Sequence, residues 1–157
     1  MTRKEIKIAY TEYESLNQLE AEDRALAEAA IEATASSYAP YSNFNVGAAV
    51  LFDDGVMIQG SNQENAAYPS GLCAERTALF YASASRPGIP MTAIAIAAGQ
   101  NGRLCPSPAT PCGACRQVMA QYQTKSGCPM RILLVGGDKI LRFEKVDDLL
   151  PLIFDSI

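Results

Sequence analysis

The sequence contains no histidine, and this absence excludes every mechanism that needs a histidine base and every metal site that needs an imidazole ligand. Long apolar runs are also missing, so no segment is suited to cross a bilayer, and residues 1–7 contain no apolar stretch of signal-peptide length. We therefore expect a cytoplasmic protein without a membrane partner, in a compartment where thiols stay reduced. The five cysteines are an odd number, so they cannot all pair within the chain.

Basic clusters are scarce as well. The net charge is -4 and the isoelectric point about 4.8, and the longest basic grouping is the pair Arg3 and Lys4. Because a nucleic-acid-binding protein usually carries a basic face or stripe, the sequence predicts a small-molecule partner and no nucleic acid. A chain of 157 residues, of which 48% are hydrophobic, is long enough to form one domain with a buried core.

Hydrophobic periodicity along the chain predicts an α/β protein. Strands are predicted at residues 6–10, 46–52, 56–59, 91–98, 131–135 and 139–143, with a hairpin turn at 53–55. Helices are predicted over 74–83, 113–122 and, briefly, 147–150, and loops over 62–72 and 99–111. An earlier helix should follow a capping box of Ser15 and Gln18. Its buried face carries Leu19, Leu26, Ala27, Ala30 and Ile31.

Three cysteines stand at predicted helix starts. Cys73 precedes one helix, and Cys112 and Cys115 lie at the start of another. The partial positive charge of a helix N-terminus lowers the pKa of a thiol there, and thiolates bind Zn²⁺ at about 2.3 Å. Three protein ligands leave one tetrahedral position for water, which is the pattern of a catalytic zinc site. The sequence therefore predicts a zinc centre held by these three cysteines.

Two charged residues follow Cys73 closely. Glu75 is well placed to take a proton from a water molecule and pass it on, without being a metal ligand. Arg76 can donate hydrogen bonds to the thiolates and so offset the negative charge that three of them place around a dication. A glutamate in a first helical turn is also common for a simpler reason, because it complements the helix dipole.

Other interpretations of the cysteines stay open on this pattern. A single Cys-x-x-Cys pair is also typical of a structural zinc site, of a redox pair, or of two small core residues. The sharpest alternative is a closed structural site in which Cys105 joins Cys73, Cys112 and Cys115 as a fourth ligand. Such a site needs no neighbouring glutamate, which favours the catalytic interpretation. Cys128 has no partner motif and is interpreted as a packing residue.

At these residues the sequence resembles the small homotetrameric, three-cysteine cytidine deaminases. Residues 73–78 (CAERTA) and 111–117 (PCGACRQ) match the two zinc motifs of that family. Residues 38–49 (YAPYSNFNVGAA), 62–68 (NQENAAY) and 148–154 (DLLPLIF) are similar to further segments of it. The resemblance implies a three-layer α/β/α fold with a central mixed sheet of about five strands. It also implies that residues 1–157 form one deaminase domain, in which 1–19 are an N-terminal extension of unclear role.

The resemblance also implies which residues meet the substrate. Phe44 would pack against the pyrimidine ring, and Asn62 with Glu64 would bind the ribose 3′-hydroxyl. The backbone groups of Ala74 and Cys112 would read the cytosine edge. Taken without the family, Phe44 is simply a core residue and the 62–65 stretch a solvated loop.

Shared active sites are a further implication. Phe154, and in part Tyr68, would come from a neighbouring subunit of a homotetramer and cover the site. The alternative is that Phe154 packs on its own domain, together with Leu149 and Leu150.

The activity implied is hydrolysis of cytidine and deoxycytidine to uridine and deoxyuridine with release of ammonia, as a step of pyrimidine salvage. One zinc ion per subunit would activate water, and Glu75 would shuttle the protons. Two alternatives remain at this point. One is a deaminase for a nucleoside analogue of the blasticidin S type, and the other is a binding module stabilised by a four-cysteine structural zinc.

Overall fold

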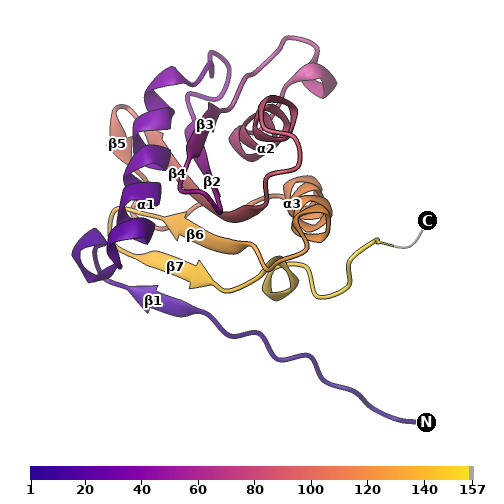
Figure 1. The fold of residues 1–157 in the computed structure, drawn as a ribbon. Coiled ribbons are helices and arrows are strands. Elements are labelled where there is room, and N and C mark those ends of the chain that lie inside the picture. The colour runs from indigo at the N-terminus through magenta and orange to yellow at the C-terminus, as the bar shows by residue number, and fades with distance from the viewer. Residues whose placement is uncertain (156–157) are drawn as a thin grey trace.

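The computed structural model describes residues 1–155 (Figure 1). Residues 156 and 157, the last two of the predicted domain, lie outside the described part. Seven strands form one sheet in the order β1-β7-β6-β4-β2-β3, with β5 paired to β4. The strands are β1 (Thr11–Tyr13), β2 (Asn45–Phe52), β3 (Met57–Ser61), β4 (Met91–Gln100), β5 (Arg103–Leu104), β6 (Arg131–Val135) and β7 (Ile140–Phe143). Because β4 and β6 are parallel and the other pairs antiparallel, the sheet is mixed, as expected.

The expectation of about five strands was too low, because two short strands had no strong hydrophobic signal. β5 lies in the segment predicted as a loop and pairs with the end of β4. Asn101 and Gly102 connect them with φ angles of 53° and 73°, as in a tight type I′ hairpin turn. The strand predicted at residues 6–10 was also wrong. Pairing with β7 begins only at Thr11, the first residue of β1.

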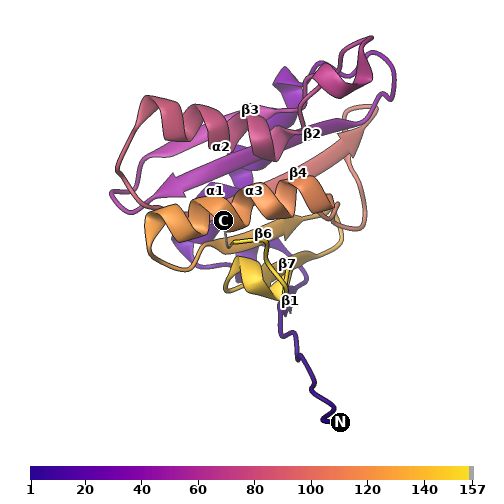
Figure 2. The same ribbon diagram turned by 90° about the vertical axis from the view of Figure 1, so that its right-hand side faces the viewer.

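Helices cover both faces of the sheet, which confirms the three-layer architecture. The helix α1 (Ala21–Ala33) lies on one face, and α2 (Ala74–Ser85) and α3 (Gly113–Ser126) lie on the other (Figures 1 and 2). Successive residues of β4 serve the two cores in turn, Ala93 and Ala95 toward α1 and Ile94 and Ile96 toward α2 and α3. A strand buried on both faces requires a continuous apolar run, and β4 provides one.

The first helix begins later than the capping box predicts. Residues Leu16–Gln18 form a short 3-10 helix instead, and Ser15 makes no side-chain capping bond. Gln18 Oε1 accepts a hydrogen bond of 2.7 Å from the Glu14 backbone N–H, outside any α-helix. The α-helix starts at Ala21, after Glu20. The predicted buried face is confirmed for Leu19, Leu26, Ala27 and Ala30, while Ile31 is half-buried.

The starts of α2 and α3 agree with the prediction, and these starts position the site. Cys73 is the N-cap of α2 and Cys112 the N-cap of α3. Gly60 of β3 allows α2 to approach the sheet closely, since a Cβ atom there would lie 2.5 Å from the Ala78 backbone nitrogen. Further short 3-10 helices lie at Thr34–Ser36, Tyr68–Ser70 and Val146–Asp148, the last near the predicted helix at 147–150. Among residues 1–155, no helix combines the length and apolar character that a membrane crossing needs.

Candidate metal and active centre

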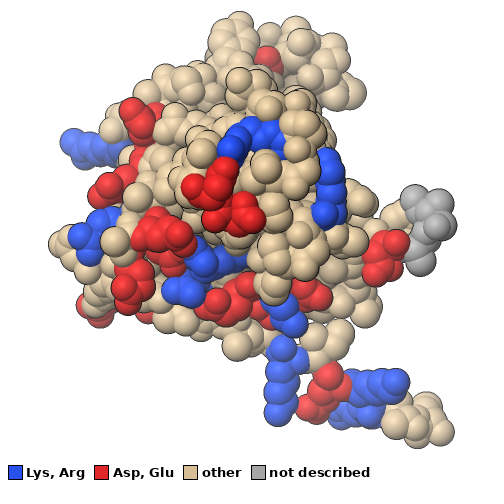
Figure 3. Space-filling model, viewed as in Figure 1, with Lys and Arg blue, Asp and Glu red and all other residues tan. Residues whose placement is uncertain are grey.

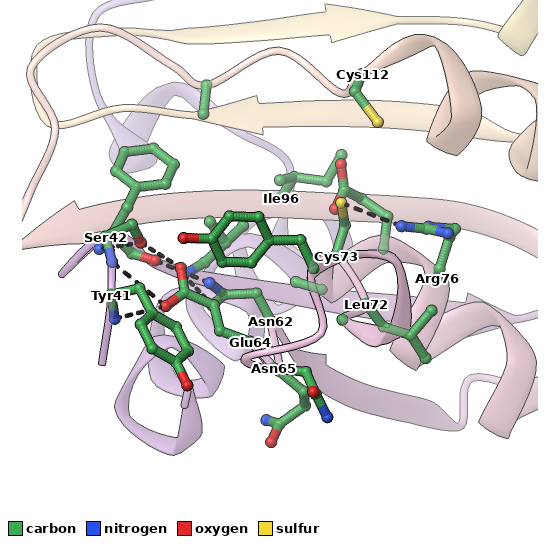
Figure 4. A pocket seen from close by; sticks show the side chains of 18 of the residues that line it. Tyr41, Ser42, Asn62, Glu64, Asn65, Leu72, Cys73, Arg76, Ile96 and Cys112 are labelled. Atoms are coloured by element: carbon green, nitrogen blue, oxygen red, sulfur yellow. Dashed lines mark hydrogen bonds between the residues drawn. The ribbon is translucent and has the colours of Figure 1, made fainter. Parts of the chain in front are cut away.

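Two helix N-termini bring three thiols together. Cys73 and Cys112 are the N-caps of α2 and α3 (Figure 4), and Cys115 lies in the first turn of α3. The three sulfur atoms all lie within 4.8 Å of one another. Sulfur ligands about 2.3 Å from a tetrahedral zinc ion stand about 3.8 Å apart. The cluster therefore needs only a small contraction to hold zinc, and its soft thiolate donors suit that metal.

The neighbours of Cys73 favour its thiolate form, which is the form that binds a metal cation. A hydrogen bond from Cys115 and the guanidinium of Arg76 lower the pKa of Cys73 to about 5. Hydrogen bonding to Cys73 and burial raise the pKa of Cys115. Arg76 Nη2 lies 3.7 Å from the Cys73 sulfur, the contact drawn in Figure 4. Within the described residues Cys105 and Cys128 lie outside this cluster, so Cys105 does not join it as the fourth ligand that the structural alternative requires.

Glu75 lies beside the thiols with its side chain almost fully buried, at 5% exposure. Burial, followed by the negative charge of Cys73, raises the pKa of its carboxyl. A carboxyl whose pKa is shifted toward neutrality can both accept and donate a proton near neutral pH. The position and environment of Glu75 therefore suit proton transfer rather than metal binding.

A cavity of about 840 Å³ opens in front of this centre. Its wall includes Cys73, Cys112, Glu75 and Arg76, together with five further residues singled out in the sequence: Phe44, Asn62, Glu64, Tyr68 and Ala74. Phe154 does not line this cavity. It is 67% exposed, and its backbone carbonyl accepts a hydrogen bond of 2.7 Å from the Gln117 side chain. The described structure thus brings together every predicted site residue except Phe154 and the buried Cys115 around one hollow.

Asn62 and Glu64 have a structural task that the sequence did not suggest. Asn62 accepts a hydrogen bond from the Val46 N–H at 2.8 Å and donates one to the Phe44 carbonyl at 2.9 Å. Glu64 accepts hydrogen bonds from the Tyr41 N–H at 2.9 Å and from Ser42. Hydrogen bonding, most of all from the Ser42 hydroxyl, lowers the pKa of Glu64. The two side chains therefore fix the segment that carries Phe44.

Sequence reasoning missed other residues of this region. Ile96, in the middle of β4, lines the cavity, as do Ala109 and Thr110 of the loop before Cys112. Arg116 holds that loop, because it donates hydrogen bonds to the carbonyls of Pro111 at 2.9 Å and Leu149 at 2.7 Å. Arg116 could have been found from its position inside the 111–117 motif. No feature of the sequence distinguishes Ala109 or Ile96 from the residues next to them as part of a cavity wall.

The comparisons with known proteins agree with this geometry. A family model described as the cytidine and deoxycytidylate deaminase zinc-binding region matches residues 20–128. This chain belongs to that family. The matched deaminase region contains all three clustered cysteines and Glu75, and it leaves residues 1–19 outside.

Individual relatives of this deaminase family extend the match. A cytidine deaminase from Halalkalibacterium halodurans is 50% identical over 96 residues, which cover 61% of this chain and 68% of the relative. A cytidine deaminase from Mycobacterium tuberculosis is 39% identical over 122 residues, covering 78% of this chain and 81% of the relative. The crystal structure of cytidine deaminase from Burkholderia pseudomallei has a TM-score of 0.69 and 45% identity, over 83% of this chain and 97% of that one.

Proposed function

We propose that this chain is a zinc-dependent hydrolase that converts cytidine and deoxycytidine, with water, to uridine and deoxyuridine plus ammonia. The observation that carries the proposal is the cluster of three thiols within 4.8 Å, with the buried Glu75 beside it in the wall of one cavity. Membership of the deaminase family and the names of the relatives support the same reaction.

In this proposal Cys73, Cys112 and Cys115 hold one zinc ion per subunit. When bound, zinc lowers the pKa of a water molecule to about 7 and so supplies a nucleophile at neutral pH. Glu75 accepts the proton of that water and donates it to N3 of the cytosine ring as oxygen adds to C4. Glu75 then takes the proton of the hydroxyl group now on C4 and passes it to the exocyclic amine, so that C4 becomes a carbonyl, the C4–N4 bond breaks, and ammonia leaves. Arg76 offsets the charge of the thiolates through its contact with Cys73.

We assign the sugar to Asn62 and Glu64 and the base to Phe44. A carboxylate has about four acceptor positions, and Glu64 uses three of them within the chain. One position is left for a ribose hydroxyl while the segment around Phe44 stays fixed. The first N–H groups of a helix have no partner inside the helix, so the backbone of Ala74 can meet the cytosine edge. Both cytidine and deoxycytidine carry the 3′-hydroxyl that this assignment uses.

The charges around the cavity support a nucleoside rather than a nucleotide or polynucleotide. Among the described residues that line it, Arg76 is the single cation, and its guanidinium faces the Cys73 sulfur. Glu64 and Glu75 are acidic. A phosphate group would therefore meet no free positive side chain there.

We further propose a homotetramer with shared active sites, in which residues 1–157 act as one domain. The exposed aromatic side chains of Tyr68, at 80%, and Phe154, at 67%, are the kind that a neighbouring subunit would cover. A cytoplasmic location fits a zinc centre made only of thiolates, because these must stay reduced. Uridine as a product fits a role in pyrimidine salvage.

Ammonia release from the purified protein tests the reaction. Cytidine, deoxycytidine, cytidine monophosphate and blasticidin S are supplied in parallel, with Glu75→Ala as a control whose zinc content is measured. Release from the two nucleosides alone, abolished by Glu75→Ala at unchanged zinc content, is the expected result. Release from blasticidin S alone would replace the substrate, and substantial activity of Glu75→Ala would overturn the role of Glu75. No release from any substrate would favour a structural zinc module.

A further inference from the structure

The first ten residues form an extended arm that leaves the body of the protein beyond β1 (Figures 1 and 2). Within the described residues, no hydrogen bond joins residues 1–9 to the rest of the chain. Tyr10 alone is anchored, with its ring 5.4 Å from that of Phe143. The arm also lies outside the matched deaminase region, which begins at residue 20.

The arm has the side-chain pattern of a strand, although no strand in the described part of the chain pairs with it. Ile6, Ile8 and Tyr10 alternate along it and are 61%, 52% and 57% exposed. Alternate residues of an extended chain share one face, so these three form an apolar row. The row continues directly into β1, which stands at the end of the strand order. A free edge strand offers unpaired backbone groups to a further strand.

The charges of the arm favour a second copy of this chain as its partner. The arm, which projects at the lower right of Figure 3, carries Arg3, Lys4 and Lys7 against one acid, Glu5, within a chain whose net charge is -4. The next residues along the chain include Glu12, whose side chain is half-exposed. Basic and acidic residues therefore follow each other in one continuous segment, which can be complementary to a second copy of itself.

We propose that two copies of this chain pair through residues 4–12 as antiparallel strands, with a two-fold axis at Ile8. This register places Ile8 against Ile8 and Ile6 against Tyr10 of the other copy. It also places Lys4 against Glu12, and Lys7 against Ala9. A two-fold axis perpendicular to the sheet must lie midway between the two copies of one residue, because only then do opposed side chains share a face.

The neighbouring registers are less favourable, and this selects Ile8. An axis at Lys7 would oppose two lysines of like charge. An axis at Ala9 would oppose the apolar Ile6 to the charged Glu12. In the proposed register Glu12 keeps its ion pair with Lys139, at 3.2 Å in its own chain, and its carboxylate has acceptor positions left for Lys4. The start of the partner's arm then runs along the open edge of β1, and one sheet spans both copies.

Two adjacent substitutions test this pairing with opposite expectations. Ile8→Asp places two carboxylates against each other on the axis, whereas Ala9→Asp places the same carboxylate against Lys7 of the other copy. We expect Ile8→Asp to weaken self-association at least tenfold in sedimentation velocity, and Ala9→Asp to leave it unchanged or stronger. Equal effects of the two substitutions, or no effect of Ile8→Asp, would overturn the proposal. Thermal melting of both variants checks that they fold.

Cross-linking tests the register itself. Ile8→Cys brings two new thiols together across the axis, so mild oxidation should give a covalent dimer on a non-reducing gel. Lys7→Cys on the same arm opposes Ala9 and should cross-link no more than the unmodified protein with its own cysteines. Equal dimer from both variants, or none from Ile8→Cys, would contradict the proposed axis. Neither measurement depends on deaminase activity.

Discussion

The Ser42 hydroxyl links the Glu64 carboxylate to the backbone of Phe44. Its Oγ donates a hydrogen bond to Glu64 and accepts one of 3.0 Å from the Phe44 N–H. Asn62 holds the carbonyl of the same phenylalanine. Both the backbone N–H and the backbone carbonyl of Phe44 are therefore held by hydrogen bonds. Glu64 and Asn62, which are proposed to bind the sugar, thus also fix the residue proposed to contact the base.

This link predicts the effect of removing the hydroxyl. Ser42→Ala should raise KM for cytidine by about tenfold with little change in kcat, because a hydrogen bond to a charged group contributes roughly 1.5–3 kcal/mol and the reacting groups are untouched. Ser42→Thr keeps the hydroxyl and should restore KM. Steady-state kinetics of the three proteins provide the measurement. A fall in kcat at constant KM would instead place Ser42 in the chemical step.

Arg76 provides a second prediction, through its contact with the Cys73 sulfur. Arg76→Gln removes a charge that stabilises the thiolate, so zinc affinity should fall by about 10–100-fold, as is typical when a group supporting a metal ligand is lost. Competition with a chromophoric chelator measures the affinity. Arg103→Gln, on the exposed part of β5, is the matched control and should bind zinc normally. An unchanged affinity in Arg76→Gln would show that the thiolates need no such support.

The cysteines provide a third prediction, which separates a three-ligand from a four-ligand centre. Cys112→Ser should lose zinc and lower the melting temperature, because metal binding and folding are coupled. Cys105→Ser should retain one zinc ion per chain together with its activity. Metal analysis and thermal melting of the two variants provide the comparison. Loss of zinc from Cys105→Ser would favour the structural site instead.

The ion pair between Asp54 and Arg86 leads to a prediction about pH. Two hydrogen bonds of 2.6 and 2.9 Å join these residues, and the guanidinium lowers the pKa of Asp54 from 3.8 to about 2. A carboxyl with a depressed pKa stabilises the fold above its unfolded-state value, and this contribution is lost as pH falls through the folded-state value.

The measurement compares melting temperatures across that window. The melting temperature of the unmodified protein should be higher than that of Asp54→Asn at pH values above about 4. The difference between the two melting temperatures should vanish toward about pH 2. Arg86→Gln should remove the same pH dependence. A difference that is constant with pH would mean that Asp54 contributes through packing rather than through its charge.

The zinc centre could be predicted from the sequence because its chemistry is local. Cys73 and Glu75 lie on one helix start, and Cys112 with Cys115 lie on another, so two short motifs contain every chain group that the proposed reaction uses. The network around Phe44 could not be predicted in this way, because Ser42 and Glu64 meet only when the segment before β2 and the segment after β3 lie side by side. The roles proposed for Phe44, Asn62 and Glu64 came from family resemblance and stay predictions.

The same distinction explains what was missed in the fold. Central strands such as β4 have long apolar runs that any buried strand requires. β1 and β5 have three and two residues, too few for a periodicity to be visible, and only the Asn101–Gly102 turn marks the second. The alternation at residues 6–10 wrongly predicted a strand, because within residues 1–155 no strand pairs with this segment.

Gly60 determines how closely α2 packs against the sheet, and so where the start of this helix lies. Because Gly60 has no Cβ atom, the backbone of Ala78 in α2 packs directly on β3. The start of the same helix carries Cys73 and Glu75. An alanine at this position would lift or tilt α2 and carry both residues away from Cys112 and Cys115 on the other helix. The distance between Cys73 and the two cysteines of α3 therefore depends on Gly60, a residue of β3 that does not line the cavity.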